Sequence, residues 1–346
     1  MEKYDDIAIP IAWPNKTARG DEAWMAILKK VGLVKNLNFK VGHAAVVMVE
    51  RNSGEARYYD YGRYLTPRGF GRARSVNSDP RLVINTRATF DENGKLSNLD
   101  AILEELSLKE LATHGKGRLL CSLTEGVSFL KGTSFAEKIV ESGPSLYGAL
   151  APGNNSCSRY VAQIIVAALP RRDPRIRPIL YPEFIKASPT SNVVNGSSDY
   201  AVYSYENGFF EEIRMTRMQS VRFHFNQLSS NFTQNGSKNL GDDHTLGSMV
   251  TPDRVEGIPA NARWVGGLGE GCWFTINPTE SGDTYCIQRF DEFGGLVYQV
   301  YCKPEKPFDI KQEYEFTFDI QLKRHSIRQN KETIAFCTES YDIAPH

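Results

Sequence analysis

The sequence has no excess of charge, no long apolar run and no recognisable leader segment. Its 41 lysines and arginines balance 41 aspartates and glutamates, so overall charge gives no support for binding to nucleic acid or to an anionic membrane surface. No stretch approaches the roughly 18 apolar residues of a membrane span. The start, MEKYDDIAIPIAWP, lacks the basic and apolar regions of a secretory signal. These absences predict a cytoplasmic protein, or one exported without a cleavable signal.

The six cysteines and six histidines show no spacing typical of a metal site. There is no C-x-x-C pair and no zinc-finger arrangement, so we expect no metal and no cofactor. The glycine run GGLGEG at 266–271 is followed by strand-like text, whereas the dinucleotide fingerprint requires a helix there. Four of the cysteines, at positions 272, 286, 302 and 337, lie in segments whose sequence is typical of strands. We expect them to be buried free thiols in a reducing compartment.

A change in composition divides the chain. The segment ASPTSNVVNGSSDY is rich in Ser, Asn and Gly and has no apolar period, which predicts a linker over residues 188–200. In residues 1–187, segments with helical patterns alternate with segments typical of strands. Residues 201–346 are predicted to form strands and turns, and VRFHFN is one of the predicted strands. The expected fold class is α+β, with a mixed N-terminal domain followed by a mostly antiparallel β-sandwich or barrel of unknown role.

Cys157 stands in an unusual place for a cysteine. It is surrounded by polar residues in NNSCSRYV, directly before the apolar-periodic text CSRYVAQIIVAALP. Asn155 and Ser156 are good N-cap residues, so the pattern predicts a helix that begins near Cys157. A thiol at a helix N-terminus has a lowered pKa, and the thiolate is the nucleophile. Cys157 is therefore a candidate nucleophile, and the alternative is an inert packed thiol.

A nucleophilic cysteine needs a base, and His43 is the best placed histidine. It leads the apolar strand text HAAVVMVE, whereas His114 lies in loop text and His224 in strand text that we expect to face solvent. A hairpin turn at RNSGE brings RYYDYGRY back beside His43. Asp60 and Tyr59 face opposite sides of that strand, so only one can meet His43. A carboxylate stabilises an imidazolium, which favours Asp60.

Two stretches resemble a known family. YGALAPGNNSCSRYV resembles the nucleophile region of NlpC-type, papain-fold cysteine hydrolases, and VGHAAVVMVERNSGEARYYDYG resembles their histidine strand and the strand that follows. His43 precedes Cys157, which is the reverse of the usual order. That order resembles the circularly permuted branch, which includes lecithin-retinol acyltransferase relatives and bacterial two-domain proteins. The resemblance covers roughly residues 7–170 and implies a permuted papain-like domain over residues 1–187.

The resemblance implies a set of site residues. It gives Cys157, His43 and Asp60 catalytic roles, and further residues become candidates for contacts with an oxyanion or substrate: Tyr147, Asn155, Tyr59 and Arg159. The chain departs from the family in the long interval of seventeen residues from His43 to Asp60 and in the long insertion between Tyr64 and Tyr147.

The implied function is hydrolysis of an amide bond, of peptide or peptidoglycan type, through an acyl-enzyme on Cys157. A cell-wall substrate would require cytosolic wall fragments or a specialised secretion route, as for an antibacterial effector. Two alternatives stay open: a lipid-ester hydrolase or acyltransferase of the permuted branch, and a catalytically inactive binding protein. Expected partners are a peptide, peptidoglycan fragment or lipid substrate and a protein bound through the β-rich domain, with no nucleic acid.

Overall fold

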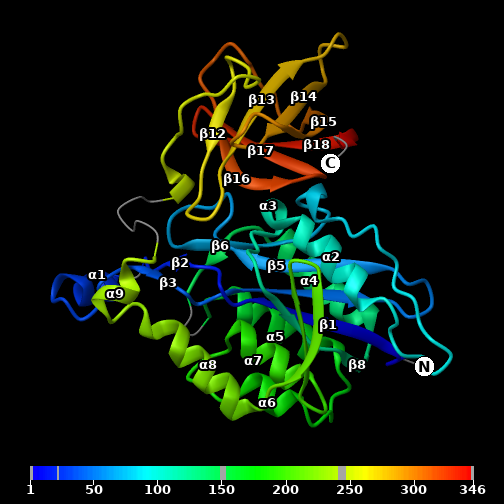
Figure 1. Ribbon diagram of the computed structural model, residues 1–346. Coiled ribbons are helices and arrows are strands. Elements are labelled where there is room, and N and C mark those ends of the chain that lie inside the picture. Colours follow the sequence, from blue (N-terminus) through cyan, green and yellow to red (C-terminus); the bar gives the residue numbers. More distant parts are fainter. Residues whose placement is uncertain (1–2, 22, 149–152, 241–246, 344–346) are drawn as a thin grey trace. The chain divides into compact units, whose positions relative to one another are not determined.

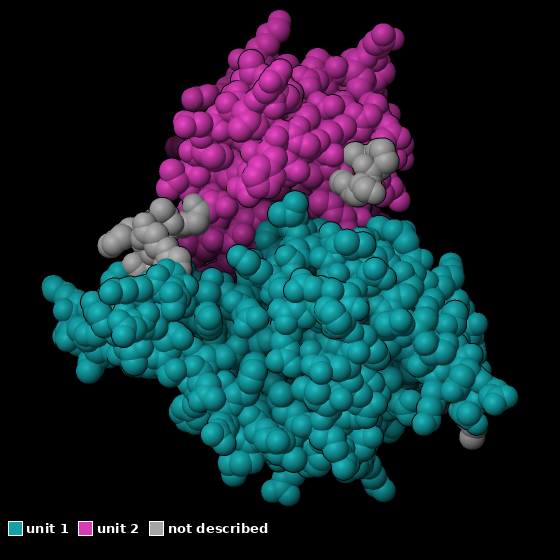
Figure 2. All heavy atoms as spheres, viewed as in Figure 1, with its two compact units in different colours: residues 1–61, 82–138, 148–245 teal, residues 62–81, 139–147, 246–346 magenta. Residues whose placement is uncertain are grey.

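The computed structural model describes residues 3–21, 23–148, 153–240 and 247–343. The chain divides into two compact units, each assembled from several stretches of sequence (Figure 2). The first unit comprises residues 1–61, 82–138 and 148–245, and the second comprises residues 62–81, 139–147 and 246–346. Neither unit is therefore a continuous half of the chain.

An antiparallel sheet forms the centre of the first unit (Figure 1). Its strands lie side by side in the order β11 (Phe209–Arg214), β10 (Ala201–Glu206), β7 (Leu119–Cys121), β1 (Asp6–Trp13), β4 (His43–Val49) and β5 (Ala56–Gly62). Strand β8 (Thr124–Val127) also pairs with β1. All eight residues of β1 are buried, which explains why its sequence is apolar from Ile7 onward instead of alternating.

Helices cover both faces of this sheet. Successive side chains of a strand point to opposite faces, and β1 therefore contributes to two cores. Ile7, Ile9 and Ile11 pack with α2 (Leu99–Leu108), while Ala12 packs with α7 (Pro189–Gly196). Helix α5 (Cys157–Ala168) lies against β4. In Figure 1, α5 and α7 lie on one side of the sheet and α2 lies on the other.

The other elements outside the barrel described below are short or peripheral. They are β2 (Ala18–Arg19), α1 (Ala23–Lys30), β3 (Asn38–Phe39), η1 (Pro80–Leu82), α3 (Glu110–Thr113), α4 (Phe129–Glu141), α6 (Ile176–Leu180), α8 (Arg217–Ser229), α9 (Gln234–Ser237) and η2 (Gly247–Met249). None of the helices within the described ranges is long and apolar enough to cross a membrane.

A nearly closed antiparallel barrel forms most of the second unit. Its strands follow the order β12 (Arg263–Val265), β13 (Cys272–Pro278), β14 (Tyr285–Phe290), β15 (Leu296–Pro304), β18 (Glu332–Ile343), β17 (Arg324–Gln329) and β16 (Glu315–Gln321). The end strands β12 and β16 also contact each other, which distinguishes a barrel from an open sheet. The expectation of antiparallel β-structure late in the chain is confirmed, and the sandwich alternative is not. The pair β6 (Phe70–Arg74) and β9 (Ser145–Leu146) belongs to the same unit.

The structure differs from the linker expected over 188–200. Residues 189–196 form α7, and every one of its residues is buried. Ser188 and Ser191 close a capping box at its start, and the Asn192 amide donates to the Ser158 carbonyl at 2.8 Å. Polar composition suggested solvent exposure, but here the polar groups are hydrogen-bonded inside the unit.

The boundary expected at residue 201 also differs from the structure. Strands β10 and β11 extend the sheet of the first unit, which continues to residue 245. The text VRFHFN is part of helix α8 and not a strand. Its aromatic residues favoured a strand, but Thr216 and Gln219 form a capping box, and that T-x-x-Q signal marks a helix start.

A buried cluster of charges ties residues 62–81 to the barrel within the second unit. The carboxylate of Asp79 lies 3.2 Å from Arg289 Nη2 and 2.9 Å from Arg81 Nε. Glu270 Oε1 lies 3.3 Å from the same Arg289 nitrogen, and Arg74 Nη1 lies 3.6 Å from Asp79. Burial alone would raise the pKa of Asp79, but Arg289 and Arg81 hold it well below its usual range. The cluster is therefore charged, and its stability requires every partner.

Replacing Asp79 with Asn should strongly destabilise the protein. The change leaves the guanidinium groups of Arg81 and Arg289 with one carboxylate, Glu270, in a dry environment. Breaking a buried ion pair in this way costs about 3–5 kcal/mol of unfolding free energy. Guanidinium-induced unfolding followed by circular dichroism measures the loss. The matched control is Asp283→Asn at an exposed carboxylate, which should leave the midpoint unchanged; equal midpoints for the two variants would contradict the role of the cluster.

Candidate functional site

Cys157 is the first residue of α5. Ser156 is the N-cap, with an extended backbone and a side-chain oxygen that accepts a hydrogen bond from the Arg159 backbone at 3.3 Å. The apolar face of α5, which includes Val161 and Ile165, is buried against the sheet. This packing fixes the helix, and the cap fixes its first turn, so the half-buried thiol of Cys157 is held at the end of the helix.

His43 and Asp60 meet on one face of the sheet. His43 is the first residue of β4, and Asp60 in β5 pairs with Ala45. Residues two apart on a strand share a face, so Asp60 is diagonal to His43 on the same side. The distance from His43 Nε2 to Asp60 Oδ2 is 3.2 Å. The Asp60 side chain is fully buried and that of His43 is 8% exposed.

Two neighbouring aromatic residues support this pair, and neither was expected at the site from the sequence pattern. Tyr58 donates its hydroxyl to Asp60 Oδ2 at 3.1 Å. Trp13, the cross-strand partner of His43, stacks on its ring with centroids 5.7 Å apart and an interplanar angle of 19°. Tyr58 therefore supplies Asp60 with a second donor, and Trp13 restricts rotation of the imidazole. Both residues lie in strands, where aromatic side chains ordinarily serve only to pack the core.

Cys157 and His43 interact closely enough to change each other's pKa. Burial alone would raise the pKa of the Cys157 thiol, but the hydrogen bond and charge of His43 lower it below its ordinary value. Burial alone would lower the pKa of His43, but its hydrogen bonds to Asp60 and Cys157 raise it. Both shifts favour a thiolate beside an imidazolium. Because Nε2 faces Asp60, Nδ1 is the ring nitrogen left for the thiol.

The other five cysteines behave in the opposite way. Burial raises the pKa of Cys272 and of Cys302 to about 12 in each case. Burial also raises the pKa of Cys121 and Cys286, and a hydrogen bond to Glu305 raises the pKa of the exposed Cys337. Cys157 is thus the one thiol of the six whose environment favours the thiolate.

The remaining residues expected at the site have other contacts. Tyr59 donates its hydroxyl to Glu137 at 3.1 Å on the opposite face from Asp60, and burial raises its pKa. Asn155 uses its side-chain oxygen to accept from the Ser156 backbone and its nitrogen to bond Gln163. The Arg159 guanidinium donates to the Asn154 carbonyl. Tyr147 belongs to the second unit, where Arg63 lies over its ring.

The arrangement is that of a thiol–imidazole–carboxylate site. A thiolate can attack an electrophilic carbon, and an adjacent imidazolium can return the proton to a leaving group. The carboxylate of Asp60 would fix the orientation of His43 and stabilise its charged form. Among the residues that the structure describes, no group of three or more His, Cys, Asp or Glu side chains is arranged to hold a metal ion.

One family match contains these three residues. Residues 8–173 match the family model described as type VI secretion system effector TseH-like, and residues 262–339 match that of the DUF6695 C-terminal domain. The crystal structure of the type VI secretion system effector TseH is similar at 18% sequence identity and a TM-score of 0.41, over 60% of this chain and 98% of that chain. No curated protein matches the sequence. The first match covers just under half of the chain.

Cys157 should be alkylated selectively at low pH. An ordinary thiol with a pKa of about 8.5 is only about 0.3% thiolate at pH 6, whereas the lowered pKa of Cys157 gives a larger thiolate fraction there. Iodoacetamide at pH 6, with mass-spectrometric mapping, should label Cys157 before the exposed Cys337. Labelling should fall as pH drops through the pKa of Cys157, because protonation removes the nucleophile.

His43→Ala is the variant that tests the cause of this reactivity. It removes the imidazole, which is the largest influence lowering the pKa of Cys157, and leaves the burial of the thiol and its contacts with Ser158 and Ala44. Labelling at pH 6 should therefore slow by about tenfold or more. Accessibility alone would instead predict that Cys337 reacts first in both proteins. If Cys337 does react first, or if the variant labels as fast as the parent, Cys157 is not activated.

Asp60→Asn distinguishes the two candidates for the third residue. It removes a charged hydrogen bond to His43, and such bonds contribute about 1.5–3 kcal/mol. The pH midpoint of Cys157 labelling should therefore rise by about one unit or more. Tyr59→Phe is the matched control on the neighbouring position, because its hydroxyl bonds Glu137 on the other face. If the pH midpoint of labelling shifted for Tyr59→Phe and not for Asp60→Asn, Tyr59 and not Asp60 would be the third residue of the site.

Proposed function

We propose that the protein is a cysteine hydrolase that cleaves an amide bond of peptide or peptidoglycan type. The observation that carries this proposal is the pairing of His43 with buried Asp60 at 3.2 Å beside the one thiol with a lowered pKa. In this reading Cys157 is the nucleophile, His43 the general acid and base, and Asp60 the residue that orients His43. The arrangement is the one that a papain-like site of permuted motif order requires.

The reaction follows from the protonation states. The Cys157 thiolate attacks the carbonyl carbon, a C–S bond forms, and the carbonyl oxygen becomes an oxyanion. The His43 imidazolium gives its proton to the amide nitrogen, the C–N bond breaks, and an amine leaves a thioester on Cys157. Water then attacks the thioester while His43 takes its proton. A carboxylic acid leaves and the thiolate beside an imidazolium is restored.

The oxyanion requires a hydrogen-bond donor. The first N–H groups of a helix have no partner within that helix, so the backbone N–H of Cys157 is suited to this role. Asn155 is less suited, because one of the two hydrogens on its amide nitrogen already bonds Gln163 Oε1. The α5 dipole also favours negative charge at the same place, both on the thiolate and on the oxyanion.

The proposal extends to where the protein acts. The match of residues 8–173 to a model of type VI secretion effectors supports export without a cleavable signal. An effector delivered to another bacterium would meet peptidoglycan, whose peptides are joined by amide bonds. This supports the cell-wall amide over the lipid ester as the substrate of the proposed hydrolase.

The proposed activity can be tested with purified protein and defined substrates. Soluble peptidoglycan fragments, peptide anilides and a phospholipid ester should be incubated with the parent protein, and products identified by mass spectrometry. We expect new amine and carboxylate ends from an amide substrate. Cys157→Ser should reduce the rate by at least about 1000-fold, because nucleophile and base act as a unit.

The control is Cys286→Ser, which removes a half-buried thiol with a raised pKa and should keep full activity. Cleavage of the ester alone would replace the amide hydrolase with the lipid-ester alternative. An absence of cleavage from every substrate, despite a reactive Cys157, would favour the binding-protein alternative. An intact-mass increase on Cys157 would identify the acyl-enzyme directly.

A further inference from the structure

Helix α8 exposes apolar side chains that the fold does not use. Two residues that are two positions apart on a helix point to nearly opposite sides. Phe223 therefore packs against the buried cluster that includes Val202, whereas Phe225 is 57% exposed. Met218, Arg222 and Phe225 follow one another at intervals of four and three residues, so they form one exposed stripe along the helix.

The segment after α6 widens this stripe into a patch. The Phe184 ring meets the Phe225 ring edge-on, with centroids 5.2 Å apart, and the Tyr181 carbonyl accepts from Arg217 Nη2 at 3.1 Å. Figure 1 shows α6 and α8 at the same end of the first unit. Single exposed apolar residues are ordinary, but a group of them indicates a binding surface. We call four residues the apolar patch and give their exposed fractions: Tyr181 74%, Ile185 85%, Met218 76% and Phe225 57%.

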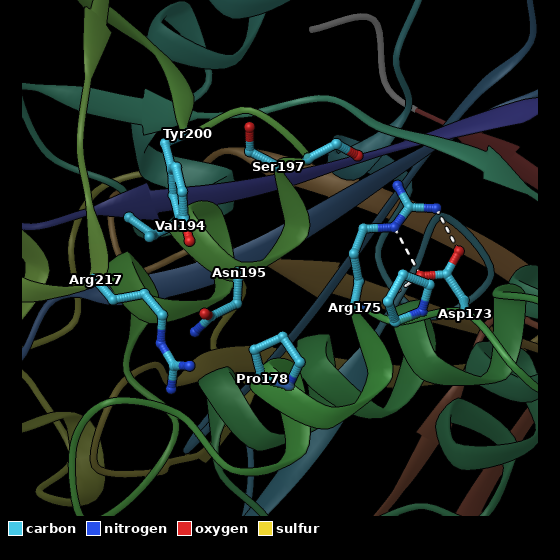
Figure 3. Close-up of a pocket in the computed structure, with 10 residues that line it drawn as sticks. Asp173, Arg175, Pro178, Val194, Asn195, Ser197, Tyr200 and Arg217 are labelled. Carbon is cyan, nitrogen blue, oxygen red and sulfur yellow. Dashed lines mark hydrogen bonds and ion pairs between the residues drawn. The ribbon is translucent and has the colours of Figure 1, made fainter.

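An excess of positive charge accompanies the apolar patch. Residues 171–186 and α8 contain six arginines and one lysine, against two carboxylates, Asp173 and Glu183. Each carboxylate already has a cation: Asp173 lies 2.7 Å from Arg175, and Glu183 lies 3.5 Å from Arg217. Figure 3 shows Arg175 with Asp173 on one side of a pocket of about 480 Å3 and Arg217 on the other. These two arginines are neutralised, so the excess charge belongs to the others.

Four arginines are exposed and make no ion pair with any residue that the structure describes: Arg171, Arg172, Arg177 and Arg222. Arg177 lies one turn of α6 before Tyr181, whose backbone N–H donates to the Arg177 carbonyl at 2.9 Å. Arg222 lies between Met218 and Phe225 on the stripe of α8. The charge of the whole chain is balanced, so this excess is local to one surface of the first unit.

This combination favours an anionic lipid surface over other occupants. A second copy of the chain would bring like charges together. A nucleic acid would engage the arginines but leave Ile185 and Met218 in water. A protein partner would need a matching hollow for each protruding side chain. A lipid surface is fluid, so protruding apolar side chains enter the boundary between head groups and acyl chains while arginines beside them reach the phosphates.

We propose that the apolar patch and its four unpaired arginines bind the protein to an anionic lipid surface. Ile185, Met218, Tyr181 and Phe225 enter the head-group region, and the arginines contact lipid phosphates. The contact is peripheral, since only side chains enter the lipid. It requires no chemistry at Cys157, and it does not rest on the hydrolase proposed above.

Sedimentation with lipid vesicles tests the proposal on the purified full chain. Vesicles of phosphatidylcholine alone are compared with vesicles of phosphatidylcholine and phosphatidylglycerol at about two to one. We expect the protein to sediment with the anionic vesicles, to stay in solution with the neutral ones, and to be released by high salt. If it stays in solution with both, the proposal is wrong, and an acidic protein becomes the better occupant. Equal sedimentation with both would also overturn it, because the arginines would then contribute nothing.

Variants locate the contact on the protein. Ile185→Ser combined with Met218→Ser should lower partitioning onto anionic vesicles by about tenfold or more, because two apolar anchors are lost. Arg222→Gln should lower it by about fivefold, the effect of one basic residue near such a surface. These side chains are exposed, so the unfolding midpoint should match that of the parent. Partitioning equal to the parent for both variants would place the contact elsewhere and contradict the proposal.

Leu108→Ser is the matched control for the apolar anchors. Leu108 is 81% exposed at the end of α2, where the neighbouring Lys109 is paired with Glu105 at 2.8 Å. Its partitioning should stay within about twofold of the parent, and a loss as large as that of the double variant would reveal nonspecific adhesion and overturn the proposal. Cys157→Ser should bind vesicles as the parent does, and the patch variants should label Cys157 as the parent does. Failure of the lipid contact and failure of the proposed hydrolase can therefore be told apart.

Discussion

The buried carboxylate of Asp60 is the constraint on which the first unit depends. A carboxylate with no exposure is costly unless donors surround it, and here His43 and Tyr58 supply them. Tyr58 lies on the same strand as Asp60, but His43 reaches Asp60 only in the observed pairing of β4 with β5. A shift of one residue would turn Tyr59 toward His43 and leave Asp60 on the other face. The hydrogen bond between His43 and Asp60 therefore favours this register, and the register gives His43 its orientation toward α5.

The parts of the site that follow local rules could be predicted from the sequence. A polar cap before an apolar-periodic run placed Cys157 at a helix start. Strand alternation allowed only one of Asp60 and Tyr59 to meet His43, and the ability of a carboxylate to stabilise an imidazolium favoured Asp60. Those rules act over a few residues or across one hairpin. Tyr58 and Trp13 could not be found in the same way, because their contacts to Asp60 and His43 look like ordinary strand packing in the sequence.

The division of the chain could not be predicted, since it rests on contacts between distant residues. Asp79 lies 210 positions before Arg289, and no local pattern links them. The linker prediction for residues 188–200 was wrong for a different reason. Amino-acid composition shows how polar a segment is, but not whether it is buried. Ser188 caps the start of the helix, and the Asn192 amide donates to the Ser158 carbonyl, so these polar groups have hydrogen-bond partners inside the unit. A Ser/Asn-rich segment can therefore form a buried helix. Polar residues indicate a linker only when their hydrogen bonds go to water.

The interleaving of the two units connects the barrel to the thiol site through the chain itself. Strand β5 carries Asp60 and passes into the second unit at residue 62, and the second unit's segment 139–147 ends ten residues before Cys157. If the barrel loses its order, both site-bearing segments lose a fixed end. The conformational entropy they gain then opposes the fixed geometry that an activated nucleophile requires. The charge cluster at Asp79 holds together the segments of the second unit itself. This sets the chain apart from a catalytic domain with a module added through a linker, where removal of the module leaves the active site intact.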